Sequence, residues 1–389
     1  MSKVLMYSTS QLFGKRVTGG LKRFLELYHG LKDKGIEVDM FCGDSPEILE
    51  ENDVSAQSLF TEKVSKNIFI PTELKYFLRN LKTLNKIKKR KYDLIIVFDV
   101  PTAVGLCLVG LKNINLFIRQ DLVGYKKIVI SERTNSKFLI NGYLTLMKLC
   151  ETLCLLKAKR IFVQCQYDLD ALIDRHKFIK NFIKRKAIIQ INNVNPSWIT
   201  NNSIERKIDS RNLFYKDDSS NEFIIGFIGD FSNERKGHRI LVDALKSLID
   251  QGINIKAILV GDGKQLPTYI TECRNYPSIK FTGRLENPIE VIRECDLMVV
   301  PSLADSCPNT VMEALYNDIP VIGTYSGGIP EILVHESTLF SPNPPSLENK
   351  IRYCLNKTNL NNIKLEQQSR KKDLNFNWPD VMLQHMHLL

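Results

Sequence analysis

Two acidic residues, Asp305 and Glu313, are separated by seven residues in a segment whose pattern predicts a strand, a loop and a helix. Residues 296–302 are a largely apolar run typical of a buried strand, and a helix is expected to begin near Asn309. Ligands of open α/β sheets bind beyond the carboxyl ends of the strands, and a helix N-terminus there offers N–H groups to phosphates. Carboxylates beside that helix suit sugar hydroxyls. The segment therefore predicts a nucleotide-sugar site, with Asn309 and Thr310 as backbone amide donors.

A pair of basic residues, Arg235 and Lys236, precedes Gly237 at the start of another expected helix. Cations at this position would stabilise the charge that develops on a departing nucleoside diphosphate. The alternative is that both are solvated charges at an ordinary helix start. Two glycines, Gly19 and Gly20, follow the first strand in a similar way. They either let the backbone approach a phosphate or form only a tight turn.

In the first half of the chain, Arg119 and Asp121 follow an expected strand at Leu116–Ile118. Asp121 has the chemistry to accept a proton or to hold an acceptor hydroxyl. Arg119 has the chemistry to hold an anionic group. Both residues would serve equally well as structural ones, so two interpretations stay open.

The elements that position these residues follow from the pattern of hydrophobicity. Short apolar runs alternate with amphipathic stretches along nearly the whole chain, which is typical of βαβ units and a parallel sheet. Strands are expected at Val4–Tyr7, Val38–Cys42, Leu94–Phe98, Leu116–Ile118, Arg160–Val163, Ala187–Ile191, Phe223–Ile228, Lys256–Val260, Ile279–Phe281, Leu297–Val300 and Pro320–Thr324. Helices are expected at residues 20–34, 72–90, 136–157, 168–176, 237–250, 264–274 and 287–294.

The alternation restarts after residues 201–221, which are polar, lack periodicity and therefore predict a linker. With 389 residues the chain exceeds the size of an ordinary single core. We therefore expect an α/β protein with two Rossmann-like domains, residues 1–200 and residues 222–375.

Positive charge is concentrated in the first half of the chain. Residues 1–200 carry 33 Lys and Arg against 19 Asp and Glu, whereas residues 201–389 carry 21 against 24. This asymmetry indicates an anionic partner for the first half, such as an anionic membrane or a phosphate-linked acceptor. Nucleic acid is not expected, because neither an aromatic-rich sheet motif nor a recognition helix is present. The helix at 74–90 has one apolar face and a basic remainder, which either stays solvated or lies on lipid headgroups.

The remaining composition indicates an ordinary soluble protein. The nine cysteines form no CxxC pair and no signal peptide precedes Val4, so reduced thiols and a cytoplasmic location are expected. No uninterrupted run of about 18 apolar residues occurs, so no transmembrane helix is expected. The apolar stretch Tyr143–Leu156, interrupted by Lys148 and Glu151, is expected to be a buried helix, with a contact to a lipid acceptor as the alternative.

Five features occur in an order that resembles glycosyltransferase family 4, the retaining nucleotide-sugar transferases of GT-B fold. They are Thr18-Gly19-Gly20, residues 227–245, the loops Gly261-Asp262-Gly263 and Phe281-Thr282-Gly283-Arg284, the Asp305–Glu313 pair, and Phe376-Asn377-Trp378 at the start of a last helix. The resemblance covers nearly the whole chain and is strongest from 223 to 331. It implies two Rossmann-like domains that face a central cleft, with a C-terminal helix, residues 376–389, that crosses back to the first domain.

The resemblance also implies roles for these residues on the donor side. Gly19 and Gly20 would face the donor diphosphate, and the loops at Gly261, Gly283 and Arg284 would lie near the nucleobase and ribose. Each of these loops taken alone is also compatible with an ordinary turn.

This sequence departs from the family pattern at three positions. Asp230 occupies the place of the usual arginine, and Arg235 is expected to replace it from a loop one residue longer. The first acid, which in the family bonds the donor sugar, is Asp305 instead of Glu, and its reach is shorter by about 1.5 Å. The second acid, Glu313, would bond the ribose. Gln120 stands where relatives often have an acceptor-side histidine.

The function implied by the resemblance is retaining transfer of a hexosyl or N-acetylhexosaminyl unit from a nucleoside diphosphate sugar, and a UDP-sugar is the expected donor. The expected acceptor is a hydroxyl of a lipid-linked glycan in surface polysaccharide assembly, such as O-antigen, lipopolysaccharide or capsule. Neither a metal nor another cofactor is expected, and the enzyme is expected on the inner face of the plasma membrane. Alternatives are a nucleotide-sugar epimerase of the same fold and an inactive donor-binding partner subunit. A glycosidase would need paired acids flanking the scissile bond, which nothing in the sequence requires.

Overall fold

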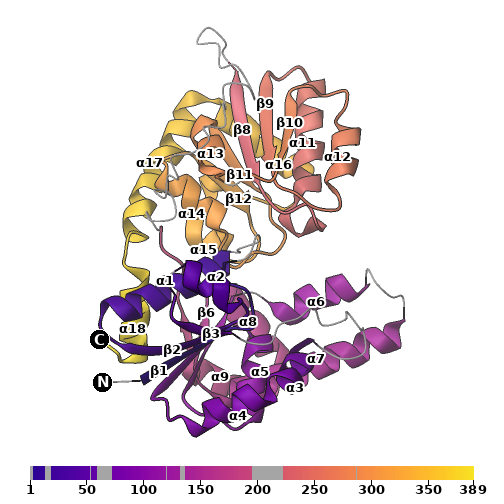
Figure 1. Cartoon of the computed structure of the whole chain (residues 1–389). Helices are drawn as coiled ribbons and strands as arrows, with labels where there is room; N and C mark the ends of the chain where they lie inside the picture. The colour runs from indigo at the N-terminus through magenta and orange to yellow at the C-terminus, as the bar shows by residue number, and fades with distance from the viewer. Residues whose placement is uncertain are drawn as a thin grey trace. The chain divides into compact units, whose positions relative to one another are not determined.

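The structure, a computed structural model, describes residues 3–13, 19–52, 54–58, 72–119, 121–131, 136–194, 222–285 and 287–389. Gln120 and the expected linker 201–221 lie outside the described residues. The chain divides into two units, Met1–Gln190 with Asn377–Leu389, and Ile191–Phe376. Each unit contains one parallel sheet with helices around it (Figure 1).

The sheet of the first unit has the order β3-β2-β1-β4-β5-β6-β7, and all its pairings are parallel. Its central strands β4 and β5 are buried throughout, as expected for a parallel sheet that is covered on both faces. The strands are β1 (Lys3–Tyr7), β2 (Glu37–Cys42), β3 (Ala56–Ser58), β4 (Leu94–Phe98), β5 (Ile114–Ile118), β6 (Ala158–Val163) and β7 (Ala187–Ile189).

Helices cover both faces of this sheet. Successive side chains along each strand point to opposite faces, so they pack into two separate layers. The helices are α1 (Gly19–Asp33), α2 (Pro46–Glu51), α3 (Thr72–Arg79), α4 (Leu81–Lys89), α5 (Val100–Leu108), α6 (Leu122–Ser131), α7 (Lys137–Lys157), α8 (Gln166–Arg175), α9 (Lys180–Lys186) and α18 (Trp378–Met386). On one face Phe98, Phe117 and Phe162 stack in a row. On the other face Val97 and Leu116 belong to the core that contains α5 and the C-terminal half of α7.

The last helix, α18, belongs to the first unit and packs against α1, which confirms the expected return of the chain. Trp378 of α18 lies 6.4 Å from Phe117 between ring centroids, and the Arg23 guanidinium of α1 lies 5.4 Å from the Trp378 ring. Lys34 and Asp380 form an ion pair of 3.1 Å between the same two helices. The cation–π contact and the ion pair hold α18 on α1, and the Trp378–Phe117 contact holds it against β5.

The second unit repeats the architecture with the strand order β10-β9-β8-β11-β12-β13, again parallel. Its strands are β8 (Phe223–Ile228), β9 (Ile255–Val260), β10 (Ile279–Gly283), β11 (Leu297–Val300), β12 (Val321–Thr324) and β13 (Leu339–Phe340). Its helices are α11 (His238–Asp250), α12 (Leu266–Glu272), α13 (Ile289–Glu294), α14 (Asn309–Tyr316), α15 (Ile329–Leu333), α16 (Pro344–Leu355) and α17 (Lys357–Asp373). The two parallel Rossmann-like sheets confirm the expected α/β class.

Two of the expected helices differ from the expectation. The basic helix expected at 72–90 is two helices, because the Asn80 side chain donates to the Tyr76 carbonyl at 3.1 Å and the chain bends there. The stretch expected to be a buried helix lies in α7, which by length and composition alone is apolar enough to cross a membrane. Only 28% of its most apolar window is buried, so α7 is not an ordinary core helix.

Candidate functional site

The loops at the carboxyl edge of the second sheet are joined backbone to backbone. The Leu303 N–H, after β11, donates to the Arg235 carbonyl, after β8, at 2.8 Å. Gly237 has φ +72°, and a Cβ there would overlap the carbonyl oxygen of Pro301. Glycine is therefore required for the β8 loop to lie this close to the β11 loop.

This close approach brings three of the predicted site residues together. The Lys236 ammonium pairs with the Asp305 carboxylate, and Arg235 Nη1 lies 3.7 Å from the same oxygen, Oδ2. Arg235 also donates to the Ala304 carbonyl at 2.9 Å. The three side chains are 24%, 21% and 14% exposed for Arg235, Lys236 and Asp305. Two cations face one carboxylate, so the cluster keeps an excess positive charge that an anionic ligand could balance.

The backbone of Asp305 is held by a glycine pair that follows β12. The Gly328 N–H donates to the Asp305 carbonyl at 2.9 Å. Gly327 has φ +59°, and a Cβ there would overlap that same carbonyl oxygen. We did not assign Gly327 and Gly328 to the site from the sequence, although a glycine pair directly after a buried strand was the available signal.

Helix α14 begins at Asn309 as predicted, with Pro308 at its N-cap. Asn309, Thr310 and Glu313 are all half-buried. Glu313 lies one turn into the helix, and its carbonyl accepts the Asn317 N–H at 3.2 Å. The loop that carries Asp305 therefore leads directly into a helix N-terminus, where N–H groups point out of the helix.

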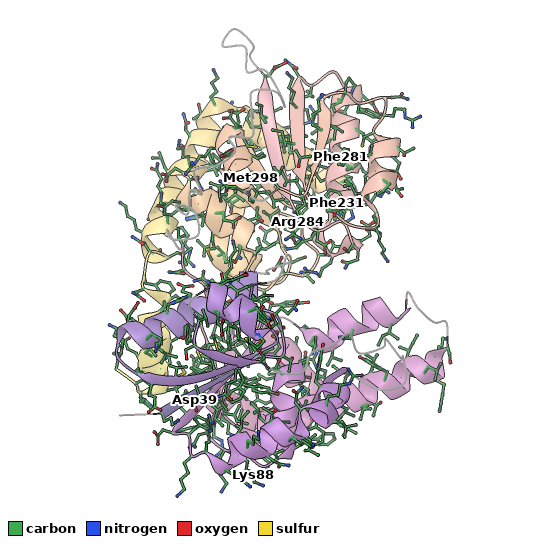
Figure 2. The ribbon with its side chains drawn as sticks, viewed as in Figure 1. Asp39, Lys88, Phe231, Phe281, Arg284 and Met298 are labelled. Carbon is green, nitrogen blue, oxygen red and sulfur yellow. The ribbon has the colours of Figure 1, made fainter. Side chains whose placement is uncertain are left out.

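The loops after β9 and β10 extend the same edge. Gly261 N–H donates to the Gly283 carbonyl at 2.9 Å, and Phe231 N–H donates to the Asp262 carbonyl at 3.0 Å. Figure 2 shows Phe231, Phe281 and Arg284 in this unit, and Arg284 is exposed. The predicted loops at Gly261 and Gly283 thus contact each other through backbone atoms.

His238, the first residue of α11, is fully buried behind this edge. Its ring lies 4.8 Å from the rings of Phe231 and Tyr269, and its Nε2 is 3.0 Å from Gln265 Oε1. Burial lowers the pKa of His238, because the imidazolium would lose its hydration there. Nothing in the sequence indicated this buried ring cluster beyond the place of His238 next to Gly237.

In the first unit, Arg119 lies at the carboxyl end of β5 and pairs with Asp99 at the end of β4. Arg119 Nε is 3.1 Å from Asp99 Oδ2. The guanidinium occupies the space that a Cβ at Gly20 would need, so Arg119 covers the start of α1. The structure thus brings Gly20 and Arg119 together, while Gly19 is the first residue of α1. Asp99, which neutralises Arg119, was not identified from the sequence.

Asp121 has two structural partners. Its Oδ1 accepts the Gly124 N–H at 3.1 Å, which caps α6, and lies 2.8 Å from Arg175 Nη1. Arg175 and His176 both bond the buried carboxylate of Glu151, each at 2.7 Å. Burial alone would raise the pKa of Glu151, but the bonds from His176 and Arg175 outweigh it and hold that pKa below its ordinary value.

This network was missed, although an acid inside an otherwise apolar helix signals a cationic partner. Among the described residues, no group of three or more His, Cys, Asp and Glu side chains could hold a metal ion.

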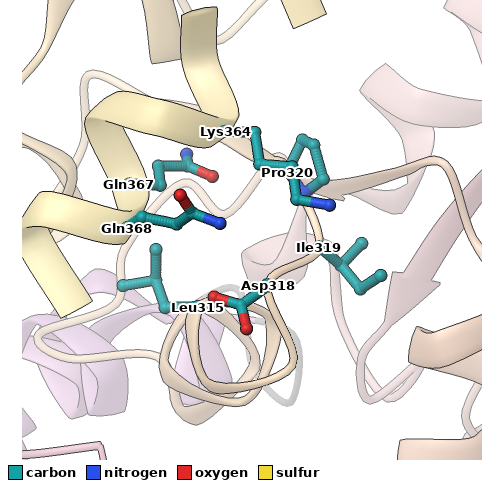
Figure 3. A pocket seen from close by; sticks show the side chains of 7 residues that line it. All are labelled: Leu315, Asp318, Ile319, Pro320, Lys364, Gln367 and Gln368. Carbon is teal, nitrogen blue, oxygen red and sulfur yellow. The ribbon is translucent and has the colours of Figure 1, made fainter. Parts of the chain in front are cut away.

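A small hollow lies beneath Pro320 at the amino end of β12, lined by α14 and α17 residues including Leu315 and Gln367 (Figure 3). Gln367 bonds both backbone groups of Val321 there, so it has a structural role at the edge opposite to the site.

Comparison with known proteins follows the same division of the chain. The family described as "Glycosyl transferases group 1" matches residues 222–357, the part with the Arg235–Lys236–Asp305 cluster. An uncharacterized glycosyltransferase of Methanocaldococcus jannaschii is 26% identical over 306 residues, which are 75% of this chain and 70% of that protein. The capsular polysaccharide biosynthesis glycosyltransferase CapM of Staphylococcus aureus is 21% identical over 271 residues, 64% of this chain and 69% of CapM.

Solved structures resemble the chain over its whole length. Sucrose-phosphate synthase from Thermosynechococcus elongatus has a TM-score of 0.73 at 19% identity, covering 100% of this chain and 98% of that one. Anabaena HepE in complex with UDP-glucose has a TM-score of 0.68 at 17% identity, covering 100% and 99%. At these identities the structures show the fold, which is GT-B. Residues 222–357 therefore match the glycosyltransferase group 1 family, and the chain has the GT-B fold and is a glycosyltransferase.

Proposed function

We propose that the protein transfers a hexosyl or N-acetylhexosaminyl unit from a UDP-sugar to a hydroxyl of a lipid-linked glycan, with retention at the anomeric carbon. The bond from the anomeric carbon to the diphosphate oxygen breaks, and the bond to the acceptor oxygen forms on the same face. The departing diphosphate takes the electron pair, and the acceptor hydroxyl gives up its proton. No protein nucleophile takes part.

The observation that carries this proposal is the Arg235–Lys236–Asp305 cluster beside the start of α14. A diphosphate placed here would neutralise the excess positive charge of the cluster. It would also accept hydrogen bonds from the backbone N–H groups of Asn309 and Thr310. These cations stabilise charge where it develops as the diphosphate leaves. Asp305 would then be free to hold a sugar hydroxyl, and Glu313 would hold the ribose.

The same residues make a metal unnecessary in the proposal, because Arg235 and Lys236 supply the positive charge that a divalent ion otherwise supplies. Turnover in excess EDTA at the metal-supplemented rate is the expected result. A dependence on added Mg²⁺ or Mn²⁺ would overturn this part of the proposal.

On the acceptor side we assign Arg119, Gln120 and Asp121. Arg119 and Asp121 lie at the carboxyl end of β5, and both already have ion-pair partners. We therefore assign Arg119 and Asp121 the role of orienting the acceptor. Asp121 would also accept the proton of the acceptor hydroxyl. A lipid-linked acceptor accords with the basic first half of the chain and with the capsule-related relative, and it places the enzyme on the cytoplasmic face of the membrane.

A thermal-shift panel of UDP-glucose, UDP-N-acetylglucosamine, GDP-mannose and UDP alone tests donor binding. A ligand at 100 times its dissociation constant stabilises the native state by about 2.7 kcal/mol. We expect one UDP-sugar to raise Tm most, and Glu313→Ala to reduce the Tm shift from every nucleotide, because all of them contain the ribose that Glu313 would hold. If no nucleotide sugar changes the Tm of the wild-type protein, the proposed site is wrong.

Proton NMR of the reaction with the selected donor tests the chemistry. Retaining transfer gives an axial product linkage from an axial donor linkage. An epimerised donor in the absence of acceptor would identify an epimerase instead. Donor binding without any turnover in the presence of membrane extracts would identify an inactive partner subunit.

A further inference from the structure

Helix α7 presents a stripe of large apolar side chains to solvent. Phe138, Leu149 and Leu156 are 85%, 61% and 44% exposed. They are eleven and seven residues apart, which is about three and two helical turns, so they lie on one side of the helix. The buried residues Met147, Cys150 and Cys154 lie on the opposite side. The stripe is therefore the outer surface of a helix that is otherwise anchored in the core.

The N-terminal half of α7 has little cover. None of residues 137–146, all of which the structure describes, is buried, although they include Leu139, Ile140 and Leu144. This half packs on α6, and the two helices extend away from the sheet of the first unit (Figure 1). An apolar helix that lies outside the core of its own unit needs another apolar partner.

The dimensions of α7 fit insertion into the membrane interface better than a complete span. Its exposed N-terminal half has ten residues and is about 15 Å long. A span needs about 20 residues, whereas interfacial helices bury their apolar side about 5–10 Å into the lipid. The C-terminal half is held in the protein core, where Glu151 binds Arg175 and His176. It therefore cannot leave the protein to complete a span.

The neighbouring helices add positive charge and more exposed leucines. Helix α5 contacts both α7 and α3, and α4 contacts α5 as well, so these helices form one layer. Leu78 of α3 and Leu108 of α5 are 65% and 45% exposed. The exposed basic residues of α4 and α7 are Lys82, Lys86, Lys88, Lys89, Lys137, Lys148 and Lys157. The only acid in α4 and α7 is Glu151, which is buried and paired.

We propose that this layer is a membrane-docking surface. The α7 stripe, Phe138, Leu149 and Leu156, inserts among the acyl chains of an anionic bilayer, and the lysines of α4 contact the lipid phosphates. Exposed apolar side chains on α7 and exposed lysines on α4 and α7 match the two layers of an anionic membrane, which are its acyl chains and its phosphates. The inference depends on the proposed function only for its purpose, which is access to a lipid-linked acceptor.

Co-sedimentation with vesicles tests the surface without donor or acceptor. The wild-type protein should bind vesicles of phosphatidylglycerol and phosphatidylcholine, and bind pure phosphatidylcholine at least about tenfold more weakly. Leu149→Glu should weaken binding to the anionic vesicles about tenfold or more, since it places a charge in the acyl layer. Lys82→Glu, Lys86→Glu and Lys89→Glu combined should weaken binding and remove its salt dependence.

Matched controls exist on α17 of the second unit. Leu365, which is 64% exposed, can be changed to Glu, and Lys357, Lys364 and Lys372 can be reversed together. These controls should bind vesicles as the wild-type protein does. Equal loss in the control and test variants, or no vesicle binding by the wild-type protein, would overturn the proposal. A dimer in vesicle-free solution that Leu149→Glu dissociates would also overturn it, because the stripe would then be covered by a second copy.

Insertion depth gives a second test that does not depend on losing a contact. Phe138→Trp places an indole on the stripe, and brominated lipids quench an indole that reaches the acyl chains. We expect strong quenching for Phe138→Trp and little change for Leu365→Trp. Absence of quenching while vesicle binding persists would show that the stripe does not insert. Donor-induced thermal shifts should be unchanged in every variant, so failure of docking is distinguishable from failure of the donor site.

Discussion

The carboxyl edges of the two sheets have the same position in the fold but different charge balance. In the second unit, Arg235 and Lys236 share the single carboxylate of Asp305. In the first unit, Arg119 pairs one to one with Asp99. Arg175 of the first unit lies between two carboxylates, those of Asp121 and Glu151, so both of these arginines, in the part of the edge that the structure describes, are balanced by acids.

This difference indicates which edge is prepared for an anion. An uncompensated cation in a half-buried loop is stabilised when a phosphate arrives, whereas a balanced pair must first be broken. The second unit therefore has the electrostatic character of a diphosphate site. The first unit has the character of a surface that orients a partner by hydrogen bonds. Both edges carry glycines where another group comes close, the Arg119 guanidinium at Gly20 in the first unit and backbone carbonyls at Gly237 and Gly327 in the second, so glycine alone does not distinguish them.

The largest effect is expected from Lys236→Ala. Removing a cation that stabilises the departing diphosphate should lower kcat/KM by about 10²–10³. Steady-state kinetics with the selected donor measure this. Lys246→Ala is the matched control, because Lys246 is in the same unit but contacts the Tyr276 ring at 5.2 Å. A fall of less than tenfold for Lys236→Ala, or an equal fall for both variants, would contradict the assignment.

A smaller effect is expected from Asp305→Asn, which should lower turnover but raise the affinity for UDP. Turnover should fall about 100-fold if the carboxylate orients the sugar. Affinity for UDP alone should instead rise about tenfold, because Lys236 and Arg235 lose the carboxylate that competes with phosphate.

Isothermal titration at low and high salt measures the affinity change for Asp305→Asn, and the gain should shrink at high salt because charges are screened. Weaker binding of UDP by the variant would show that the Lys236–Asp305 pair does not compete with the donor. Asp305→Glu is the companion variant, since it keeps the charge and changes only the reach.

The sequence predicted the second edge better than the first, and the reason lies in the kind of contact. Asp305, Lys236 and the start of α14 are each read from one local pattern, a buried strand followed by a loop and a helix. The pairing of Arg119 with Asp99 joins two loops twenty residues apart, and neither loop has a local signal for it. Long-range side-chain pairing of this kind depends on packing that periodicity does not encode.

The prediction of helices from the sequence has the same limit. Helix α5 was not predicted because Val100–Leu108 is apolar on all sides and therefore has no amphipathic period. The bounds of helix α7 were predicted correctly, but its exposure was not. A helix rich in leucine is expected to be buried, and the sequence pattern does not show whether another part of the chain covers it.

Arg119→Ala tests the balanced edge. Because Asp99 already neutralises the guanidinium and the pair is partly exposed, we expect kcat/KM to fall by no more than about tenfold. The donor KM should not change, and any loss should appear in the acceptor KM. A fall as large as that of Lys236→Ala, expressed in the donor KM, would place Arg119 on the diphosphate and remove the distinction between the two edges.

The smallest expected effect concerns acid stability of the second edge. The pKa of buried His238 is lowered from 6.5 by loss of hydration, although Glu234 at 3.5 Å favours the charged form. Above pH 6.5 His238 is neutral in both the folded and the unfolded protein and adds no pH dependence. As the pH falls below 6.5, the unfolded chain binds a proton that the folded protein does not, so stability decreases until the folded pKa is reached.

His238→Phe keeps a ring between Phe231 and Tyr269 and removes this titration. We expect the urea midpoint of the wild-type protein to fall between pH 6.5 and 5, and the midpoint of the variant to fall less over the same range. His335→Phe, on the same unit but outside the buried ring cluster, should retain the wild-type slope. Parallel curves for wild-type and His238→Phe would mean that His238 is hydrated or paired in the folded protein. The ring cluster behind Lys236 would then be less closed than its burial indicates, and the rigid positioning of that cation would lose its physical basis.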